Sequence, residues 1–358
     1  MNNHRLRSLP PRGRPRISLA GLAGRVGGRS LSAAELGARF DLAPEKVTAK
    51  TGVTCLRRLD DGESIVGLAR DAARDALARA RVSPGALTAV FGSSNPTADD
   101  VLPSFTAAVA HALGLRDLVV DHVGLGCCGA LQCLRNACNQ LTADALDGRV
   151  GYALVVAGDH TSRILDPARR QTGTLFGEGA AAALLTNDPD ARTGYVIERV
   201  ATRSLLGDGL YALRLRNPWA AGEGTPLPRL EMDGARIYDF GVAAAGEFLS
   251  LLKLDAMPAG GALVPHQPNL AMLDAMTARA GLDPANVYVD GIRTIGNTSA
   301  PAALLGLEDG LRRAIVRCDQ PVVLGAFGAE LQVGAALLTP VDPAALLGPA
   351  VPRAEVAA

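Results

Sequence analysis

Three polar residues far apart in the chain have side chains that together can carry out nucleophilic catalysis. Cys127 lies where an apolar, strand-like run meets a helix-like segment. His266 directly follows a second apolar run, and Asn297 lies in the short sequence Ile-Gly-Asn-Thr-Ser-Ala-Pro. A cysteine can attack an electrophile, while histidine and asparagine can act as a base or as hydrogen-bond donors. The three residues therefore form a candidate nucleophilic site.

Each residue also has an ordinary structural interpretation. Free cysteines are often small buried apolar residues, and most single histidines have structural or surface roles. An asparagine before Thr-Ser is a favoured turn residue or helix N-cap. Taken one at a time, the structural roles are favoured. The presence of all three at strand ends of one α/β sheet favours the catalytic interpretation.

The position of Cys127 predicts a reactive thiol. A cysteine at a strand-to-helix turn lies near unpaired backbone N–H groups at the positive end of the helix dipole. Such placement can lower the pKa of a thiol from about 8.5 to ~3.5–7.5, so we expect a thiolate at neutral pH. Gly124, Gly126 and Gly129 allow the chain to bend there.

The elements that position these residues alternate along the chain. Apolar runs predict strands, and apolar residues at helical spacing predict helices, so the fold class is α/β in layers. The predicted strands cover residues 16–24, 87–94, 118–126, 151–159, 180–187, 260–268 and 320–328, and the clearest helices cover 64–82 and 128–146. Residues 174–186 and 325–339 share a Phe-Gly pattern followed by an apolar strand, which is either coincidence or an internal duplication. Residues 205–232 are rich in Gly, Pro and Arg and are interpreted as the join or a cap between halves.

Composition excludes several classes of protein. The formal net charge is zero, which argues against a nucleic-acid partner. No apolar run reaches the roughly 20 residues of a membrane span, and the N-terminus lacks the apolar part of a secretory signal. We therefore expect a cytoplasmic protein with no membrane association, a disordered basic arm over 1–16 and a loose tail over 341–358. The six cysteines show no metal-ligand spacing, so no metal site is predicted.

At these residues the sequence resembles β-ketoacyl-acyl-carrier-protein synthase III of the thiolase superfamily. The resemblance covers roughly residues 17 to 340 and rests on motifs that occur in a fixed order. They are Thr-Gly-Val at 51–53, LPSFTAA at 102–108, VGLGCCG at 123–129, Asp-Pro with FGEGA at 166–180, HQPN at 266–269, GNTSAP at 296–301 and AFGAELQVGAALL at 326–338.

The resemblance implies a thiolase-like fold of two duplicated mixed-sheet halves, in a five-layered α/β/α/β/α arrangement. The nucleophile half would span 17–190, and the half with the histidine and asparagine would span 191–340. The family roles fall on Cys127 as nucleophile, because Gly129 follows it two residues on, and on His266 and Asn297. The resemblance also implies a homodimer.

Further family roles fall on five residues. The backbone N–H groups of Cys127 and Ala329 would form the oxyanion hole. Arg163 and Phe327 would contact the substrate, and Leu102 would close the acyl pocket of the partner subunit.

The activity implied is acyl transfer through an acyl-cysteine, with an acyl-CoA or acyl carrier protein as partner and no metal or other cofactor. The leading expectation is decarboxylative Claisen condensation of an acyl thioester with a malonyl-type thioester, because Asn297 is present. The alternative is an O- or N-acyltransferase acting on a natural-product hydroxyl or amine, with His266 as base.

Three positions depart from the family pattern. Lys46 replaces a tryptophan that stacks on the coenzyme A adenine, and Ala271 replaces an arginine near the tunnel mouth. Glu330 lies in a turn that is normally a run of glycines. These departures favour a member from specialised metabolism, such as polyketide synthesis. We expect donor entry to depend on Arg163 more than on Lys46, because only Arg163 matches a family entrance residue.

Overall fold

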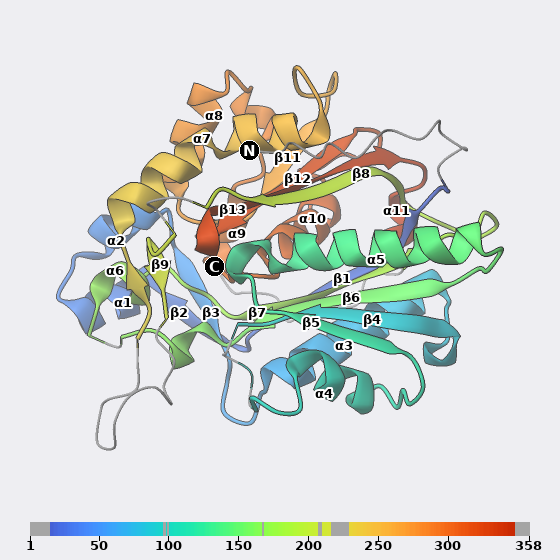
Figure 1. The fold of residues 1–358 in the computed structure, drawn as a ribbon. Coiled ribbons are helices and arrows are strands. Elements are labelled where there is room, and N and C mark those ends of the chain that lie inside the picture. Colours follow the sequence, from blue (N-terminus) through green and yellow to red (C-terminus); the bar gives the residue numbers. More distant parts are fainter. Residues whose placement is uncertain are drawn as a thin grey trace, which may run out of the picture.

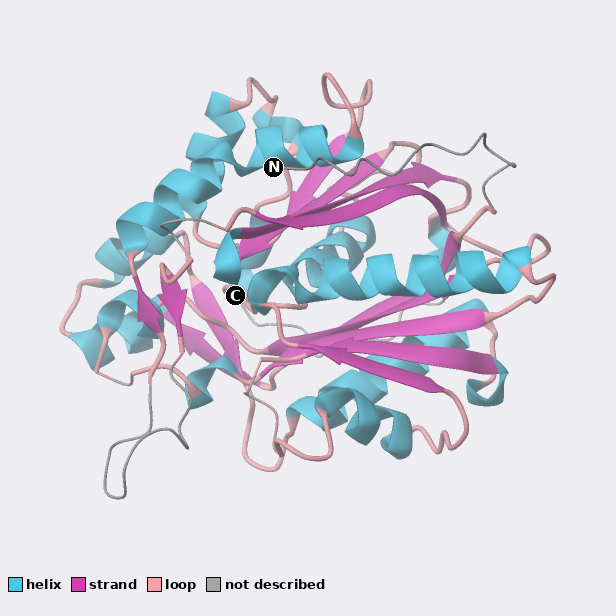
Figure 2. Cartoon of the chain, in the orientation of Figure 1, coloured by secondary structure: helices cyan, strands magenta, loops and turns pink. Residues whose placement is uncertain are grey.

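Strands buried between layers of helices form the body of the protein (Figure 1). The computed structural model describes residues 15–95, 98, 100–166, 168–206, 210–215 and 229–347. Figure 2 shows five layers, in which helices cover the outer face of each of two packed sheets and further helices lie between them. The predicted α/β class and the thiolase-like fold are confirmed.

The first half of the fold is a five-stranded mixed sheet. Its hydrogen-bonding order is β5-β4-β6-β7-β1. Its strands are β1 (Ser18–Val26), β4 (Leu87–Ser93), β5 (Val119–Val123), β6 (Tyr152–Asp159) and β7 (Gly179–Thr186), its outer helices are α3 (Ile65–Ala80) and α4 (Phe105–Ala112), and its inner helix is α5 (Gly129–Leu146). All eight residues of β7 are buried, as a central strand covered on both faces requires.

The second half repeats this arrangement with four strands, in the order β11-β12-β13-β8. The strands are β8 (Tyr195–Ser204), β11 (Ala262–Pro265), β12 (Val322–Gly328) and β13 (Gln332–Pro340), the outer helices are α7 (Gly234–Leu252) and α8 (Leu270–Arg279), and the inner helix is α10 (Ala302–Arg312).

Strand directions show that the two halves are copies of one plan. In the first half β4 pairs with β6 in parallel, and the β6–β7 and β7–β1 pairs are antiparallel. In the second half β11 pairs with β12 in parallel, and the β12–β13 and β13–β8 pairs are antiparallel. The Phe-Gly echo in the sequence therefore marks the equivalent strands β7 and β13. Strand β5 has no counterpart among the described strands of the second half.

The halves share both hydrogen bonds and a core. Ser18 and Leu19 of β1 pair with Val196 and Tyr195 of β8, which joins the two sheets into one nine-stranded order. One apolar cluster fills the space between the sheets around α5 and α10. Two others lie under α3 with α4 and under α7 with α8. This burial of three separate apolar layers holds the five-layered arrangement together.

Short elements gather at one end of the sheets (Figure 1). They are β2 (Arg29–Ser32), α1 (Ala33–Phe40), α2 (Pro44–Thr51), β3 (Cys55–Arg58), α6 (Arg170–Gly173), β9 (Leu213–Arg214), β10 (Glu231–Met232) and α9 (Asp290–Thr294). Single-turn helices are η1 (Pro84–Ala86), η2 (Gly126–Cys128), η3 (Thr161–Arg163), η5 (Pro284–Asn286) and η6 (Ala329–Leu331). Among the residues described, no helix is long and apolar enough to cross a membrane.

The seven predicted strands and both predicted helices are confirmed, with ends that differ by a few residues. The segment 205–232 is not the join between halves, because β8 already belongs to the second sheet and ends at Ser204. Within this segment, β9 and β10 pair as a small ribbon, while residues 207–209 and 216–228 lie outside the described residues.

The predicted loose tail over 341–358 is wrong for its first part. Residues Ala344–Leu347 form helix α11, in which Ala345 and Leu346 are buried. The helix packs on β1 and α3, where Gly194 leaves room for the side chain of Leu346. Residues 348–358 and 1–14 lie outside the described residues.

We expect Leu346→Ala to lower the free energy of unfolding by about 2–4 kcal/mol, because it leaves a cavity beside Gly194. Urea unfolding of the purified protein measures the loss. Leu347→Ala, at a half-buried neighbour, is the matched control and should cost less. Equal, small losses in both variants would show that α11 contributes nothing to the core.

Candidate active site

A pocket of about 380 Å³ holds the side chains of Cys127, His266 and Asn297. Three chain segments bring them there: η2, between β5 and α5; the residue after β11; and the turn between α9 and α10. Apolar side chains from β12, from helices α2, α7 and α8 and from the segment after α6 complete the wall, among them Val47, Phe176, Ile237, Met272 and Phe327. The structure therefore brings together the three residues that the sequence singled out.

The turn that carries Cys127 is pressed against the turn that follows β12. Gly126 has a φ of +53°, a backbone conformation that residues with a Cβ rarely adopt. A Cβ on Gly126 would lie 3.1 Å from the Cβ of Ala329. A Cβ on Gly328 would lie 3.1 Å from the Cβ of Cys127. A side chain at either position would crowd the facing turn, so glycine at both positions suits this close contact.

This contact brings together the two backbone segments that were assigned to the oxyanion hole. Cys127 lies in the first turn before α5, where N–H groups have no partner within the helix. Ala329 begins η6 directly after Gly328, which lines the pocket beside Cys127. Glu330 and Leu331, which follow, have φ values of +60° and +47°. They adopt at an energetic cost the left-handed backbone that glycine would adopt freely.

Burial makes Cys127 a thiol in the resting protein, which corrects the expected thiolate. Removal from water raises the pKa of Cys127 to about 12. A hydrogen bond from its Sγ to Ser299 Oγ, at 3.8 Å, opposes this shift, and the negative charge of Asp159 adds to it. The sequence predicted the helix that begins beside Cys127, but it did not predict the residues of other segments that exclude water from the sulfur. The proton of Cys127 must therefore leave during the reaction.

Cys128 lies in a different environment from Cys127. Its Sγ points toward the backbone carbonyl of Gln332, at 3.3 Å, and it is fully buried in the core between the sheets. Cys133 and Cys138 belong to the same core. Of these neighbouring cysteines, only Cys127 lines the pocket.

His266 is held by its backbone and by an aromatic contact. Its N–H donates to the carbonyl of Gly325 at 2.8 Å, and its ring meets the ring of Phe327 edge-on, with centroids 4.3 Å apart. Desolvation lowers the pKa of His266 to about 3, so the ring is neutral at neutral pH. A neutral imidazole can donate one hydrogen bond and accept one. Phe327 thus lines the pocket and supports His266.

Asn297 is fixed by contacts to its backbone and to its amide oxygen. Its N–H donates to the carbonyl of Leu175 and its carbonyl accepts from Gly177, both at 2.9 Å. Its Oδ1 accepts from the backbone N–H of Ser299 at 2.9 Å. Because the oxygen is occupied, the Nδ2 group is the donor that remains for a ligand in the pocket.

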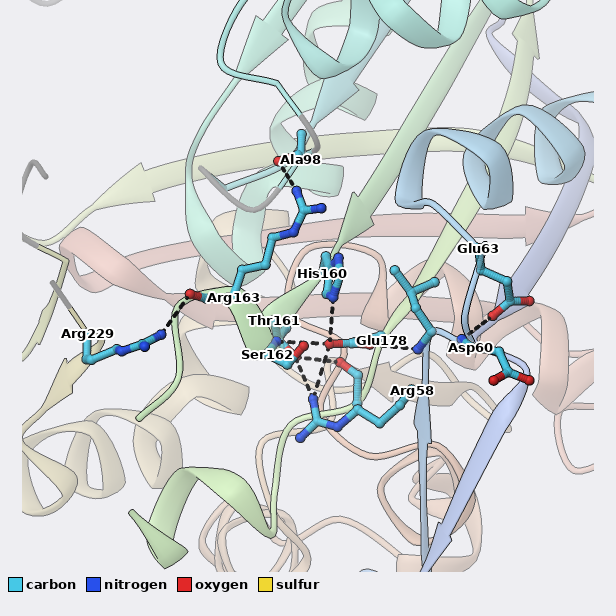
Figure 3. A network of polar contacts seen from close by, with 12 residues as sticks. Arg58, Asp60, Glu63, Ala98, His160, Thr161, Ser162, Arg163, Glu178 and Arg229 are labelled. Carbon is cyan, nitrogen blue, oxygen red and sulfur yellow. Dashed lines mark hydrogen bonds and ion pairs between the residues drawn. The ribbon is translucent and has the colours of Figure 1, made fainter. Parts of the chain in front are cut away.

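Of the residues predicted to contact substrate, Arg163 lies outside this pocket, whereas Leu102 was assigned to the pocket of a partner subunit and that role stays a prediction. Arg163 ends η3, and its guanidinium donates to the carbonyl of Ala98, as Figure 3 shows. The carbonyl of Arg163 accepts from Arg229 at 3.1 Å. Leu102 is 84% exposed on the segment between β4 and α4. Neither side chain lines the pocket around Cys127.

Three cations line this pocket, and of these the sequence had pointed only to Lys46, through its match to the family's stacking tryptophan. Lys46 and Lys50 lie one turn apart on α2, and Arg170 begins α6. All three are exposed at the mouth. Ala271 is exposed in the first turn of α8, whose residues Asn269 and Met272 also line the pocket. The i, i+4 spacing of the two lysines was visible in the sequence, but their distance from Cys127 was not.

Comparison with known proteins agrees with this geometry. Residues 122–204 match the family described as 3-oxoacyl-[acyl-carrier-protein] synthase III, and residues 261–339 match its C-terminal part. The chain is 32% identical over 336 residues to an acetoacetyl CoA synthase of Streptomyces sp. (strain CL190), covering 90% of this chain and 98% of that protein. It is 30% identical to a β-ketoacyl-[acyl-carrier-protein] synthase III of Streptomyces lividans, covering 88% and 92%.

Solved structures give the same result. The priming β-ketosynthase of the R1128 polyketide pathway superposes with a TM-score of 0.80 at 29% identity, covering 94% of this chain and 100% of that one. The 3-oxoacyl-(acyl carrier protein) synthase III of Pseudomonas aeruginosa superposes with a TM-score of 0.77 at 26% identity, covering 91% and 99%. The chain belongs to the 3-oxoacyl-[acyl-carrier-protein] synthase III family of condensing enzymes.

Proposed function

We propose that this protein joins an acyl thioester to a malonyl-type thioester by decarboxylative Claisen condensation, through an acyl group carried on Cys127. The observation that carries the proposal is the convergence of Cys127, His266 and Asn297 on one pocket. A thiol supplies the nucleophile, and two neutral hydrogen-bond donors supply a site for a developing enolate oxygen.

In the first half-reaction the Cys127 sulfur attacks the thioester carbonyl of the acyl donor. The S–H proton leaves, the carbonyl oxygen becomes an oxyanion, and backbone N–H groups at Cys127 and Ala329 donate to it. When the oxyanion collapses, the donor thiol departs with a proton and the acyl group remains on Cys127. The neutral ring of His266, in the same pocket, can take up the proton in transit.

In the second half-reaction a malonyl thioester loses CO₂ and becomes an enolate. The enolate oxygen accepts hydrogen bonds from His266 and from the Nδ2 group of Asn297. The enolate carbon then attacks the carbonyl of acyl-Cys127, a new carbon–carbon bond forms, and the sulfur of Cys127 leaves and regains a proton. The product is a β-ketoacyl thioester, and no cofactor beyond the two thioesters takes part.

The named relatives support a thioester donor on either of two carriers. One is described as an acetoacetyl CoA synthase, another as a β-ketoacyl-[acyl-carrier-protein] synthase III and a third as a priming ketosynthase of a polyketide pathway. We propose that this chain likewise starts a short acyl chain in polyketide or fatty-acid-like synthesis. Both possible carriers, coenzyme A and acyl carrier protein, present the thioester on a phosphopantetheine arm.

The cations at the pocket mouth suit such a donor. Lys46, Lys50 and Arg170 are exposed residues that line the pocket of Cys127, so they can offer positive charge to a phosphate group of the donor. An arginine can grip a phosphate with two parallel hydrogen bonds, while lysines add point charges. We propose that these residues, and not Arg163, hold the donor phosphate. This reverses the ordering expected from the sequence.

A homodimer is part of the proposal. Strand β5 ends the hydrogen-bonding order of the sheet, and its Val119 and Val120 are 47% and 41% exposed. An uncovered strand edge with exposed apolar residues is a natural surface for a second copy of the chain. The exposed Leu102 lies in the same half of the fold, where a partner could receive it.

We expect Cys127→Ala to abolish acylation, because it removes the only thiol of the pair Cys127 and Cys128 that lines the pocket. Intact mass after incubation with an acyl-CoA measures the added acyl group. Cys128→Ala is the matched control and should keep the mass shift. Peptide mapping that places the acyl group on Cys128, Cys133 or Cys138 would contradict the assignment.

We expect Asn297→Asp to slow condensation by a factor of about 10² or more, since it replaces the Nδ2 donor by a negative oxygen beside the enolate. The carboxylate still accepts from the Ser299 N–H, so the turn should keep its shape. Acylation of Cys127 should survive, because its oxyanion is held by backbone groups. The measurement is ¹⁴CO₂ release from a carboxyl-labelled malonyl thioester, with acyl-enzyme formation followed in parallel.

The same assay separates condensation from acyl transfer to oxygen or nitrogen. An acyltransferase needs no enolate, so Asn297→Asp would spare it, and an aspartate could orient His266 as a base. Wild-type protein that releases no CO₂ from any malonyl thioester, yet acylates an alcohol or amine, would overturn the proposed condensation.

We expect Lys50→Met and Arg170→Met each to raise the KM for an acyl-CoA donor several-fold, with kcat little changed, because they remove binding that is equal in ground and transition states. Arg163→Met, at an exposed arginine outside the pocket, is the matched control and should leave KM unchanged. Steady-state kinetics over a range of donor concentrations gives both constants. A larger effect from Arg163→Met would restore the ordering expected from the sequence.

A further inference from the structure

A buried polar network lies behind the nucleophile, outside the residues that were assigned to the reaction. It begins where the parallel strands β4 and β6 end side by side, with Ser93 opposite Ala157. Asp159 is the last residue of β6 and is fully buried. Asn95 follows the end of β4.

Asp159 holds Asn95 through both carboxylate oxygens. Its Oδ1 accepts from the backbone N–H of Asn95 at 2.8 Å, and its Oδ2 accepts from the Asn95 Nδ2 at 2.9 Å. The Oδ2 also accepts from the backbone N–H of Ala300 at 3.0 Å. A buried carboxylate with several N–H donors is a rigid anchor, because each lost bond would leave a buried polar group unpaired.

Asn95 in turn connects two catalytic turns. Its Oδ1 accepts from the backbone N–H of Gly126, the residue before Cys127, at 3.0 Å. Its Nδ2 donates to the Oγ of Ser299 at 3.1 Å. That same Ser299 accepts from the Cys127 Sγ and donates its backbone N–H to Asn297.

We propose that Asp159 and Asn95 are positioning residues, which lock the Cys127 turn to the Asn297 turn and thereby set the distance between the acyl group and the enolate. The inference rests on the proposed function and deepens it. Both half-reactions depend on this distance or on the shape of the Cys127 turn. Misplacement of reacting groups by about 1 Å can cost a factor of about 10².

The duplicated fold gives an independent reason to expect a role here. Asn95 lies two residues after β4 and His266 lies directly after β11, and these strands are equivalent in the two halves. In the second half, the residue at this strand end, His266, lines the pocket. In the first half, Asn95, one residue further from the equivalent strand end, holds the turns that carry the nucleophile and the second donor.

The test is Asn95→Ala against a matched control, Asn187→Ala. Asn187 makes the same kind of contacts at the opposite end of β6. Its Oδ1 accepts from the N–H of Gly151 at 2.8 Å, and its Nδ2 donates to the carbonyls of Leu141 and Arg149 at 3.1 and 2.9 Å. Both variants should lose thermal stability, whereas only Asn95→Ala should lower kcat, by about 10-fold or more, with little change in KM.

Equal kcat values in the two variants, at similar losses of stability, would overturn the proposal. If Asn95→Ala does not fold, Ser299→Ala replaces it, since that change keeps both Asp159 bonds to Asn95 and removes the bonds that Ser299 Oγ accepts from Asn95 and from Cys127. Ser299→Ala with full kcat would also overturn the proposal, and a loss of about 10-fold supports it.

A second readout does not depend on any substrate. The negative charge of Asp159 raises the pKa of Cys127, and His266, in the same pocket, is neutral. Asp159→Asn should therefore speed the alkylation of Cys127 by iodoacetamide at mildly alkaline pH, while slowing acyl transfer. Peptide mass spectrometry separates Cys127 from the exposed Cys318.

Acyl-enzyme formation and the alkylation of Cys127 together separate a failure of this proposal from a failure of the proposed function. Alkylation of Cys127 that is unchanged in Asp159→Asn would contradict the coupling of Asp159 to the nucleophile. Wild-type protein that forms no acyl-Cys127 with any thioester would instead contradict the proposed function, and the alkylation result would still decide whether Asp159 acts on Cys127.

Discussion

The close approach of two backbone turns is the constraint on which the rest of the active site depends. A Cβ on Gly126 or Gly328 would crowd the facing turn at 3.1 Å, so glycine at both positions suits the close contact between the turn before α5 and the turn after β12. Each turn belongs to a different half of the duplicated fold. The contact therefore fixes the two halves at the point where the Cys127 sulfur meets the pocket. A side chain at either glycine would separate the backbone groups assigned to one oxyanion.

Exclusion of water is the second feature that shapes this site. The residues around the pocket exclude water from Cys127 and His266. This desolvation raises the pKa of Cys127 and lowers the pKa of His266, so both groups are neutral before substrate enters. Hydrogen bonds and charges act more strongly where water is absent. A site of this kind stabilises a negative charge only where hydrogen-bond donors already point at it, as for an oxyanion or an enolate. It destabilises a free thiolate, which could be oxidised or alkylated.

The duplicated halves contribute different chemistry from equivalent places. The inner helix α5 begins beside the nucleophile, and the inner helix α10 begins beside Asn297 and Ser299. The strand ends that follow β4 and β11 carry Asn95 and His266. The same arrangement of strands and helices therefore carries the nucleophile and the Asp159–Asn95 network in one half. In the other half it carries two polar side chains, those of His266 and Asn297, that line the pocket.

The sequence by itself determined the fold class, the main strands and the identity of the three pocket residues, because strand periodicity and strand-end motifs are local signals. It did not determine the pKa of Cys127, since desolvation depends on residues from distant segments that cover the sulfur. The sequence also did not predict that α11 packs on the core. A four-residue helix is not stable by itself, and α11 depends on the space beside Gly194. The cations at the mouth and the Asp159–Asn95 anchor come from segments separated by more than fifty residues. Only the packed tertiary structure could place them beside Cys127.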